Sequence, residues 1–341
     1  MRKSAGILAI AAAGVLLLAA PFAIYPVFLM KALCFALFAS ACNLLIGYVG
    51  LVSFGHAAFF AASAYATAYL VKFMAWPSLL AVAAGTVVAG LLGWLMGVLA
   101  IRQRGIYFSM VTLALAQLVY FYFVQAPWTG AEDGIQGVPR GSLFGLVDLG
   151  NNLTMYYLVV AVFVLGFAII HRTIHSPFGQ VLKAIRDNEP RAISLGYDVV
   201  RYKLLAFVIS ATLSGLAGGM KLLAVQVASL DDAHWHMSGE VILMTLLGGM
   251  GTVVGPTVGA TFVTALEHYL SGVGSWILVV TGATFVIVVT VFRRGLVGEI
   301  HALWLRRRQA RASSLPERPE RPDGLLIGRG PQPAAVPPQS R

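Results

Sequence analysis

The side chains in this sequence that could bind a metal or move a proton fall into two short groups. Segment 231–236 (DDAHWH) places two carboxylates beside two imidazoles, which are ligands that transition metals accept. Its spacing matches no established metal motif, so we predict no metal site. Glu267 and His268 could pass a proton, but they close an apolar run near a predicted membrane surface. Neither group predicts a catalytic centre.

Motifs for nucleotide or peptide chemistry are missing from the sequence. It contains no G-x-x-x-x-G-K-[ST], no H-E-x-x-H and no G-x-S-x-G. We therefore predict no catalytic residue, no cofactor bound by this chain and no ATP hydrolysis by it. Carboxylates inside apolar runs, which mark ion-coupled pumps, are scarce. Lys221 is expected to extend its ammonium group to the membrane surface, and Glu240 to be solvated at that boundary.

Three polar residues, Ser53, His56 and Thr252, stand in or beside glycine-rich apolar runs, where they could contact a substrate. Glycine weakens a helix by roughly 1 kcal/mol, and proline bends it. The helix breaks are predicted at Gly47, Gly50, Gly55, Gly248, Gly251, Gly255 and Pro256. In lipid, such breaks are tolerated beside a cavity or where backbones approach closely. The sequence leaves both interpretations open, a substrate path and close helix packing.

These runs belong to a chain suited to lipid. It has 341 residues, of which 58% are hydrophobic and 11% charged, with a mean hydropathy of +0.81. Average soluble domains carry about 25% charged residues. We therefore predict an all-α, polytopic transmembrane helical bundle. The net charge of +10 does not indicate nucleic-acid binding, because the basic residues lie in loops and in the tail, where they orient a membrane protein.

Taking roughly 20 apolar residues as one span, we count about ten membrane segments. The first resembles a signal peptide, but we interpret it as an uncleaved helix. The segments lie near 5–24, 28–46, 51–71, 79–101, 106–125, 153–171, 204–225, 238–252, 254–270 and 275–292.

The distribution of basic residues predicts that both termini are cytoplasmic. Residues 172–203 hold six Lys and Arg against three acids, and the tail from Arg293 holds ten Arg against four acids. One long span over 238–270 would put that tail outside, so we predict a break at Gly248–Pro256. Two crossings or a re-entrant pair both satisfy the rule. The basic, Pro-rich tail 299–341 is predicted to be largely disordered and cytoplasmic.

The polar stretch 171–203 has the pattern of two short helices. Ser176-Pro177 can begin the first, Pro190 interrupts it, and Gly196 is a typical C-terminal glycine for the second. The apolar face of the first helix comprises Phe178, Val181, Leu182 and Ile185. Two such helices suit docking in a groove of a cytosolic partner. The alternative is a basic loop packed on lipid headgroups.

Several blocks, in this order, resemble the LivM/LivH permeases of branched-chain amino-acid ABC importers. NLLIGYVGLVSFGHAAFFAASAY is similar to the family's N-terminal signature. Further blocks similar to the LivM branch are RGIYFSMVTLALAQL, TGAEDGIQGVP, AIRDNEPRAISLGYDVVRYKLLAFVISATLSGLAGG, LLGGMGTVVGPTVGA and RRGLVG. The resemblance runs from about residue 30 to 298, and we assign 1–298 as a permease domain. Pro190-Arg191 and Arg293 depart from the usual pattern.

The resemblance implies that 171–203 is the coupling loop that docks on an ATPase subunit. Its predicted coupling residues are Arg186, Asp187, Glu189, Ala192 and Gly196. It also implies a LivH-like second permease, two cytosolic LivG/LivF-like ATPases that carry ATP and Mg, and a periplasmic binding protein. The implied location is the bacterial inner membrane, and the implied cargo is leucine, isoleucine and valine.

Three other functions remain open from the sequence. Relatives of this family carry urea and short amides, and no residue here separates an amino acid from a neutral amide. A secondary transporter or channel acting alone would work without ATPase subunits, but the scarcity of carboxylates in the spans disfavours it. An intramembrane enzyme would need a catalytic constellation, for which we find no pattern.

Overall fold

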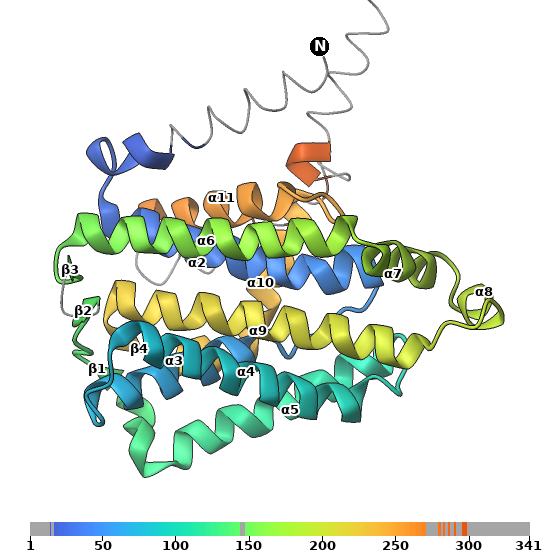
Figure 1. Ribbon diagram of the computed structural model, residues 1–341, viewed down its shortest axis with the longest axis horizontal. Coiled ribbons are helices and arrows are strands. Elements are labelled where there is room, and N and C mark those ends of the chain that lie inside the picture. The colour runs from blue at the N-terminus through green and yellow to red at the C-terminus, as the bar shows by residue number, and fades with distance from the viewer. Residues whose placement is uncertain are drawn as a thin grey trace, which may run out of the picture. The chain divides into compact units, whose positions relative to one another are not determined.

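Helices make up most of the computed structural model, which describes residues 17–143 and 147–270, with Gly14 and short stretches between 279 and 298 (Figure 1). The described residues lie in one unit, 1–301. The helices are α2 (Pro26–Asn43), α3 (His56–Lys72), α4 (Ser78–Ala100), α5 (Ile106–Gln125), α6 (Asn152–His175), α7 (Pro177–Asp187), α8 (Glu189–Ser194), α9 (Val199–Val225), α10 (Trp235–Gly248) and α11 (Gly255–Leu270).

Shorter elements connect these helices. A π-helical turn, η2 (Leu44–Val49), extends α2. The 3-10 turns are η1 (Ala20–Phe22), η3 (Pro127–Thr129), η4 (Ala131–Asp133) and η5 (Leu230–Ala233). Strand β1 (Ile135–Gln136) pairs antiparallel with β4 (Val227–Ala228), and β2 (Ser142–Leu143) pairs with β3 (Val147–Asp148). These ribbons lie at the opposite end of the long helices from α7 and α8 (Figure 1).

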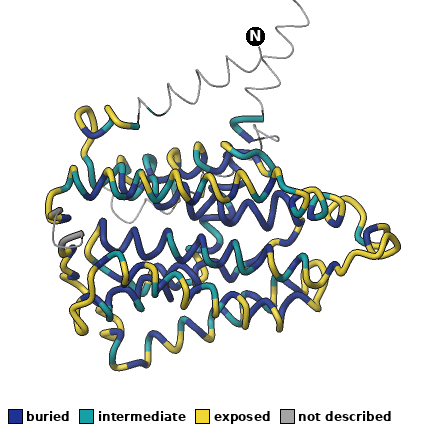
Figure 2. Tube along the Cα trace, viewed as in Figure 1, coloured by how far each residue is buried: buried dark blue, intermediate teal, exposed yellow. Residues whose placement is uncertain are grey.

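Helix α9 lies at the centre of the packing and contacts α2, α3 and α4. Its Gly218 faces the carbonyl group of Phe60, with no room for a side chain. Gly93 of α4 packs in the same way on Ala211 of α9. Small residues let helix backbones approach closely, which is the usual basis of packing in lipid. The buried surface therefore runs along α2, α3 and α9 (Figure 2).

The prediction of a mostly helical fold is confirmed for the described residues, but only part of the topology is described. Among the described residues, five helices are long and apolar enough to cross a membrane: α2 with η2, α4, α5, α6 and α9. The predicted segments 5–24 and 275–292 lie largely outside the described residues, and so does the tail 299–341. The count of about ten segments and the cytoplasmic termini stay predictions.

One predicted span differs from the helix observed, and the predicted break between Gly248 and Pro256 is confirmed. The span predicted over 51–71 is helical only from His56, because residues 50–55 form an irregular connection. Over 238–270 the chain forms two helices, since α10 ends at Gly248 and α11 begins at Gly255. Pro256, which lacks an amide hydrogen, stands in the first turn of α11, where none is needed. Each of the two is shorter than the roughly 20 residues that a full crossing takes.

Candidate functional site

The loop between α6 and α9 folds into the two helices that its pattern predicts. Ser176 caps α7, its hydroxyl accepting a hydrogen bond from the amide of Gly179 at 3.3 Å. Leu182 and Ile185 are buried, and Ile185 belongs to a small core with Ala192 and Val199. Ala192, which we predicted as a coupling residue, is part of the packing that holds α7, α8 and α9 together.

Gly196 ends α8 in a left-handed conformation with φ of +86°. Its amide donates to the carbonyl of Ile193 at 2.9 Å, and the amide of Tyr197 donates to that of Ala192 at 3.2 Å. Glycine has no Cβ penalty in this conformation, which closes the helix by satisfying its last carbonyls. Gly196 therefore shapes the backbone of the loop at the end of α8.

The tip of this loop exposes apolar side chains that the sequence analysis did not single out. Leu195 is 69% exposed and Ile193 50% exposed. Tyr197 and Val200 are also exposed. Apolar side chains this close together in a stretch as polar as 172–203 were the signal available in the sequence. They define the loop tip: Ile193, Leu195, Tyr197 and Val200.

Glu189 fixes the start of α8 to two other parts of the chain. Its carboxylate lies 2.9 Å from Nζ of Lys203, whose side chain is only 7% exposed, and 3.6 Å from a guanidinium nitrogen of Arg104. The pair with Lys203 is sheltered from water, so solvent screens it less than a surface pair. Glu189 thereby connects α8 to α9 and to the turn between α4 and α5.

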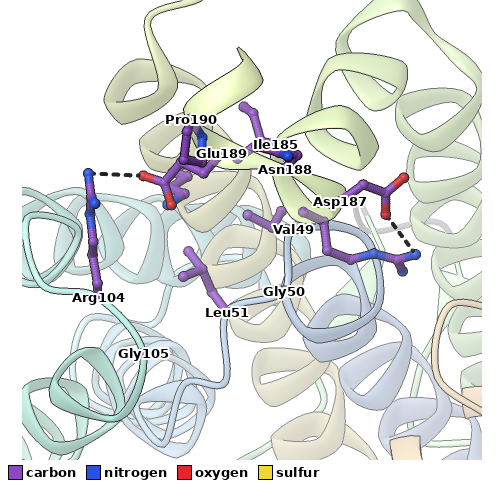
Figure 3. Close-up of a pocket in the computed structure, with 12 residues that line it drawn as sticks. Val49, Gly50, Leu51, Arg104, Gly105, Ile185, Asp187, Asn188, Glu189 and Pro190 are labelled. Atoms are coloured by element: carbon purple, nitrogen blue, oxygen red, sulfur yellow. Dashed lines mark hydrogen bonds and ion pairs between the residues drawn. The ribbon is translucent and has the colours of Figure 1, made fainter. Parts of the chain in front are cut away.

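Arg186 joins the loop to the first glycine break. Its Nη1 donates a hydrogen bond to the carbonyl oxygen of Gly47, and its Nη2 lies 3.5 Å from the carboxylate of Asp187. A pocket of about 400 Å³ opens beside it. Arg104, Glu189 and Lys203 are among the residues that line this pocket (Figure 3). Basic and acidic groups thus gather where α7, α8 and the end of η2 meet.

The two glycine breaks lie against each other. The Asn43 side chain donates from Nδ2 to the carbonyl of Thr252 at 2.9 Å and accepts from the amide of Gly251 at 3.0 Å. A Cβ on Gly47 would come within 2.6 Å of the Gly251 nitrogen, so only glycine fits there. Thr252 also caps α11, its Oγ1 accepting from the amide of Gly255 at 3.1 Å. The structure therefore brings together breaks that are about 200 residues apart.

Ser53 and His56, predicted as substrate-path residues, are fully buried among helices. Nε2 of His56 lies 2.9 Å from Oγ of Ser210, whose hydroxyl donates to the carbonyl of Ala41 at 2.6 Å. Oγ of Ser53 accepts from the amide of Gly55 at 3.2 Å. These contacts tie the start of α3 to α2 and α9. A role of Ser53, His56 and Thr252 in a substrate path stays a prediction.

At the end opposite α7 and α8, the lysine of α9 forms a buried ion pair, which corrects one expectation. Nζ of Lys221 lies 2.6 Å from the Asp232 carboxylate, and both side chains are almost completely buried. Lys221 does not extend to the membrane surface, because η5 folds over the end of α9 and brings a counter-charge to it. Asp232 thus provides the negative charge of an ion pair with Lys221.

A second charged group at the same end joins α2, α10 and α11. Nζ of Lys31 lies 3.5 Å from the carboxylate of Glu267. Glu240 of α10 stands beside Glu267, and its Oε1 is buried without a hydrogen-bond partner. The residue as a whole is half-buried, so our expectation of a solvated carboxylate fails at this one oxygen. Carboxylates are scarce along the sequence, but the fold gathers two of them beside one lysine.

Arg140, in the loop before α6, closes the end of α9. It donates from Nε to the carbonyl of Leu223 at 3.0 Å and from Nη2 to that of Ala224 at 2.7 Å. Its Nη1 donates to the Asn152 side chain at 2.7 Å. Burial lowers the pKa of the Arg140 guanidinium from its ordinary value. A cation here suits the negative end of the helix dipole.

The segment 231–236 runs from η5 into the start of α10. The imidazole of His234 accepts from the amide of His236 and so caps α10. Burial is the larger cause that holds the pKa of His234 below its usual range, and the neighbouring His236 lowers it further. Both effects favour the neutral ring. Within the part of the chain that the structure describes, no group of three or more metal-ligating side chains lies together.

Comparison with known proteins identifies the family of this chain. A family model described as the permease component of the branched-chain amino acid transport system matches residues 24–289. The chain belongs to this family. It is therefore a membrane protein, in keeping with its long apolar helices.

Individual relatives match over part of their length. The high-affinity branched-chain amino acid transport system permease protein LivM of Salmonella typhimurium is 29% identical over 233 residues, which is 62% of this chain and 55% of that protein. LivM of Escherichia coli matches to the same extent. The ribose import permease RbsC of Bacillus subtilis is 28% identical over 172 residues, 48% of this chain and 51% of that protein. The chain thus spans about half the length of these relatives. No solved structure matches.

The buried pair of Lys221 and Asp232 leads to a test of stability. Asp232→Asn should lower the free energy of unfolding by about 3 kcal/mol, because it leaves the Lys221 ammonium buried without its counter-charge. Thermal unfolding of the purified protein in detergent measures the loss. Asp231→Asn, at the exposed neighbouring acid, is the matched control and should change little. An equal effect of the two variants would contradict the assignment.

Proposed function

We propose that this chain is the membrane-spanning permease subunit of an ABC importer for leucine, isoleucine and valine in the bacterial inner membrane. Family membership and the similarity to LivM proteins support the transporter class. The observation that carries the proposal is the loop tip, whose exposed apolar side chains run from the end of α8 to the first turn of α9. The chain is not itself an enzyme in this proposal and binds no cofactor.

The loop tip fits a protein groove better than water or lipid headgroups. Exposed apolar side chains gathered on one feature commonly mark an interaction site. A short helix with apolar anchors is the usual ligand of a hydrophobic groove. We assign that groove to two cytosolic ATPase subunits, LivG/LivF-like, which carry ATP and Mg. Glu189, Asp187 and Arg186 then lie behind the docked surface.

The remaining partners follow from the same assignment. A second permease, LivH-like, would complete the substrate path, and a periplasmic binding protein would deliver substrate to the opposite end. Strands β1 and β4, which belong to loops 126–152 and 226–239, lie at that opposite end.

The charged group of Lys31, Glu240 and Glu267 supports an amino acid as the cargo. A zwitterion needs compensation for both of its charges inside a membrane. Ribose and urea carry no ionised groups and require no such compensation. Charged residues within membrane segments are costly and usually functional. A urea or short-amide permease of the same family is the alternative, and the ribose permease among the relatives shows that cargo varies.

Uptake by cells tests the cargo. Deleting the gene should reduce uptake of labelled leucine, isoleucine and valine at low substrate concentration, and a plasmid copy should restore it. Uptake of labelled ribose and urea in the same cells is the control, and neither should change. Unchanged uptake of all three amino acids would remove the substrate assignment, while a loss of urea uptake would favour the alternative.

Substitution at the loop tip tests docking. The double variant Ile193→Asp, Leu195→Asp should insert normally but retain less than about a tenth of the ATPase on co-purification, since charges would have to be desolvated in the groove. Phe73→Asp, at the exposed end of α3 far from the loop, is the matched control. Full retention of the ATPase by the double variant would show that the tip is not the docking surface.

A further inference from the structure

Arg186 occupies an unusual place, at the last turn of α7 with its guanidinium against the end of η2. In a regular helix the amide of Leu51 would donate to the carbonyl of Gly47. That amide donates instead to the carbonyl of Leu45 at 3.1 Å. Arg186 donates its Nη1 hydrogen to the carbonyl of Gly47 in its place. In a membrane domain this carbonyl needs a donor from the protein.

Three glycines lie beside this side chain, and one of them, Gly50, makes room for it. Gly50 has φ of +81°, and a Cβ there would come within 2.9 Å of Cγ of Arg186. A Cβ on Gly251 would lie 3.6 Å from Nη1 of Arg186. Gly47 itself leaves no room between Asn43 and Gly251. The glycines that break the two apolar runs therefore converge on one side chain from the loop.

Movement of α7 would reach both breaks through this contact. The hydrogen bond from Arg186 holds the end of η2, and Asn43, one helical turn before Gly47, holds the turn between α10 and α11. A displaced α7 would thus shift the end of α2 and that turn together. Lys183 of the same helix lies 5.7 Å above the Tyr48 ring and adds a second contact.

We propose that Arg186 is the positioning residue that transmits movement of the ATPase-docked loop to the glycine breaks of the membrane domain. This inference rests on the proposed transporter function, but it goes beyond docking. It assigns to one side chain the step between the loop and the helices that must open. Two other roles are distinguishable from it: Arg186 could contact the ATPase directly, or it could only stabilise the fold.

Reconstitution in proteoliposomes with the partner permease, the ATPases and the binding protein separates these roles. Arg186→Ala should assemble and hydrolyse ATP, but the amount of leucine transported per ATP should fall about fivefold or more, within the range of typical coupling between sites. Arg186→Lys keeps the charge and one donor and should recover part of that ratio. Arg102→Ala, at an exposed arginine of the turn between α4 and α5, is the matched control and should keep the wild-type ratio.

Each other outcome overturns the proposal. Loss of ATPase from the Arg186→Ala complex would indicate direct docking, and a proportional fall of hydrolysis and uptake would indicate a merely structural role. If the Arg186→Ala complex does not assemble, the Arg186→Lys complex decides between the roles. An unchanged amount of leucine transported per ATP in the Arg186→Lys complex rejects the proposal. Failure of the proposed function itself appears separately, as absence of ATP-dependent leucine uptake by the wild-type complex.

Discussion

The constraint on which the structure depends is that a backbone amide or carbonyl inside a membrane must find its partner within the protein. Every helix break therefore requires a donor or acceptor from elsewhere in the fold. Asn43 satisfies both a carbonyl and an amide of the turn between α10 and α11, and Arg186 satisfies the carbonyl of Gly47. Arg140 does the same for the last carbonyls of α9. Breaks that look like local features of the sequence are thus the points at which distant segments are held together.

This constraint also explains which parts of the fold could be predicted from the sequence. The two helices of the loop were predictable because Ser176, Pro177, Pro190 and Gly196 act on their immediate neighbours. The division between α10 and α11 was predictable from charge counting, because one uninterrupted helix would have placed a basic tail on the wrong side. The later start of α3 was not predicted, since the irregular connection before it depends on contacts with α5, including that of Ser109 with Val52.

The candidate site could be predicted only in its outline. Hydropathy and glycine spacing indicate where helices break but not which breaks meet, and the contact between Asn43 and Gly251 joins residues 208 positions apart. The burial of one Glu240 oxygen was missed for the same reason, because Glu267 stands on another helix. Lys221 was misassigned because one-dimensional hydropathy cannot show that η5 returns a carboxylate to it.

Charged contacts at both ends of the same two helices give the molecule a way to transmit force. Helix α9 is held by Lys203 to Glu189 near its start and by Lys221 to Asp232 towards its end. Helix α2 carries Lys31 with Glu267 near its start, and its π-helical extension is held by Arg186. A closely packed helix bends little, so a displacement applied at the loop end is felt at the other. In the proposed transporter, the two long helices and their end contacts would move as one mechanical unit. That unit would connect the site of ATP-driven movement with the charged group that would meet a zwitterion.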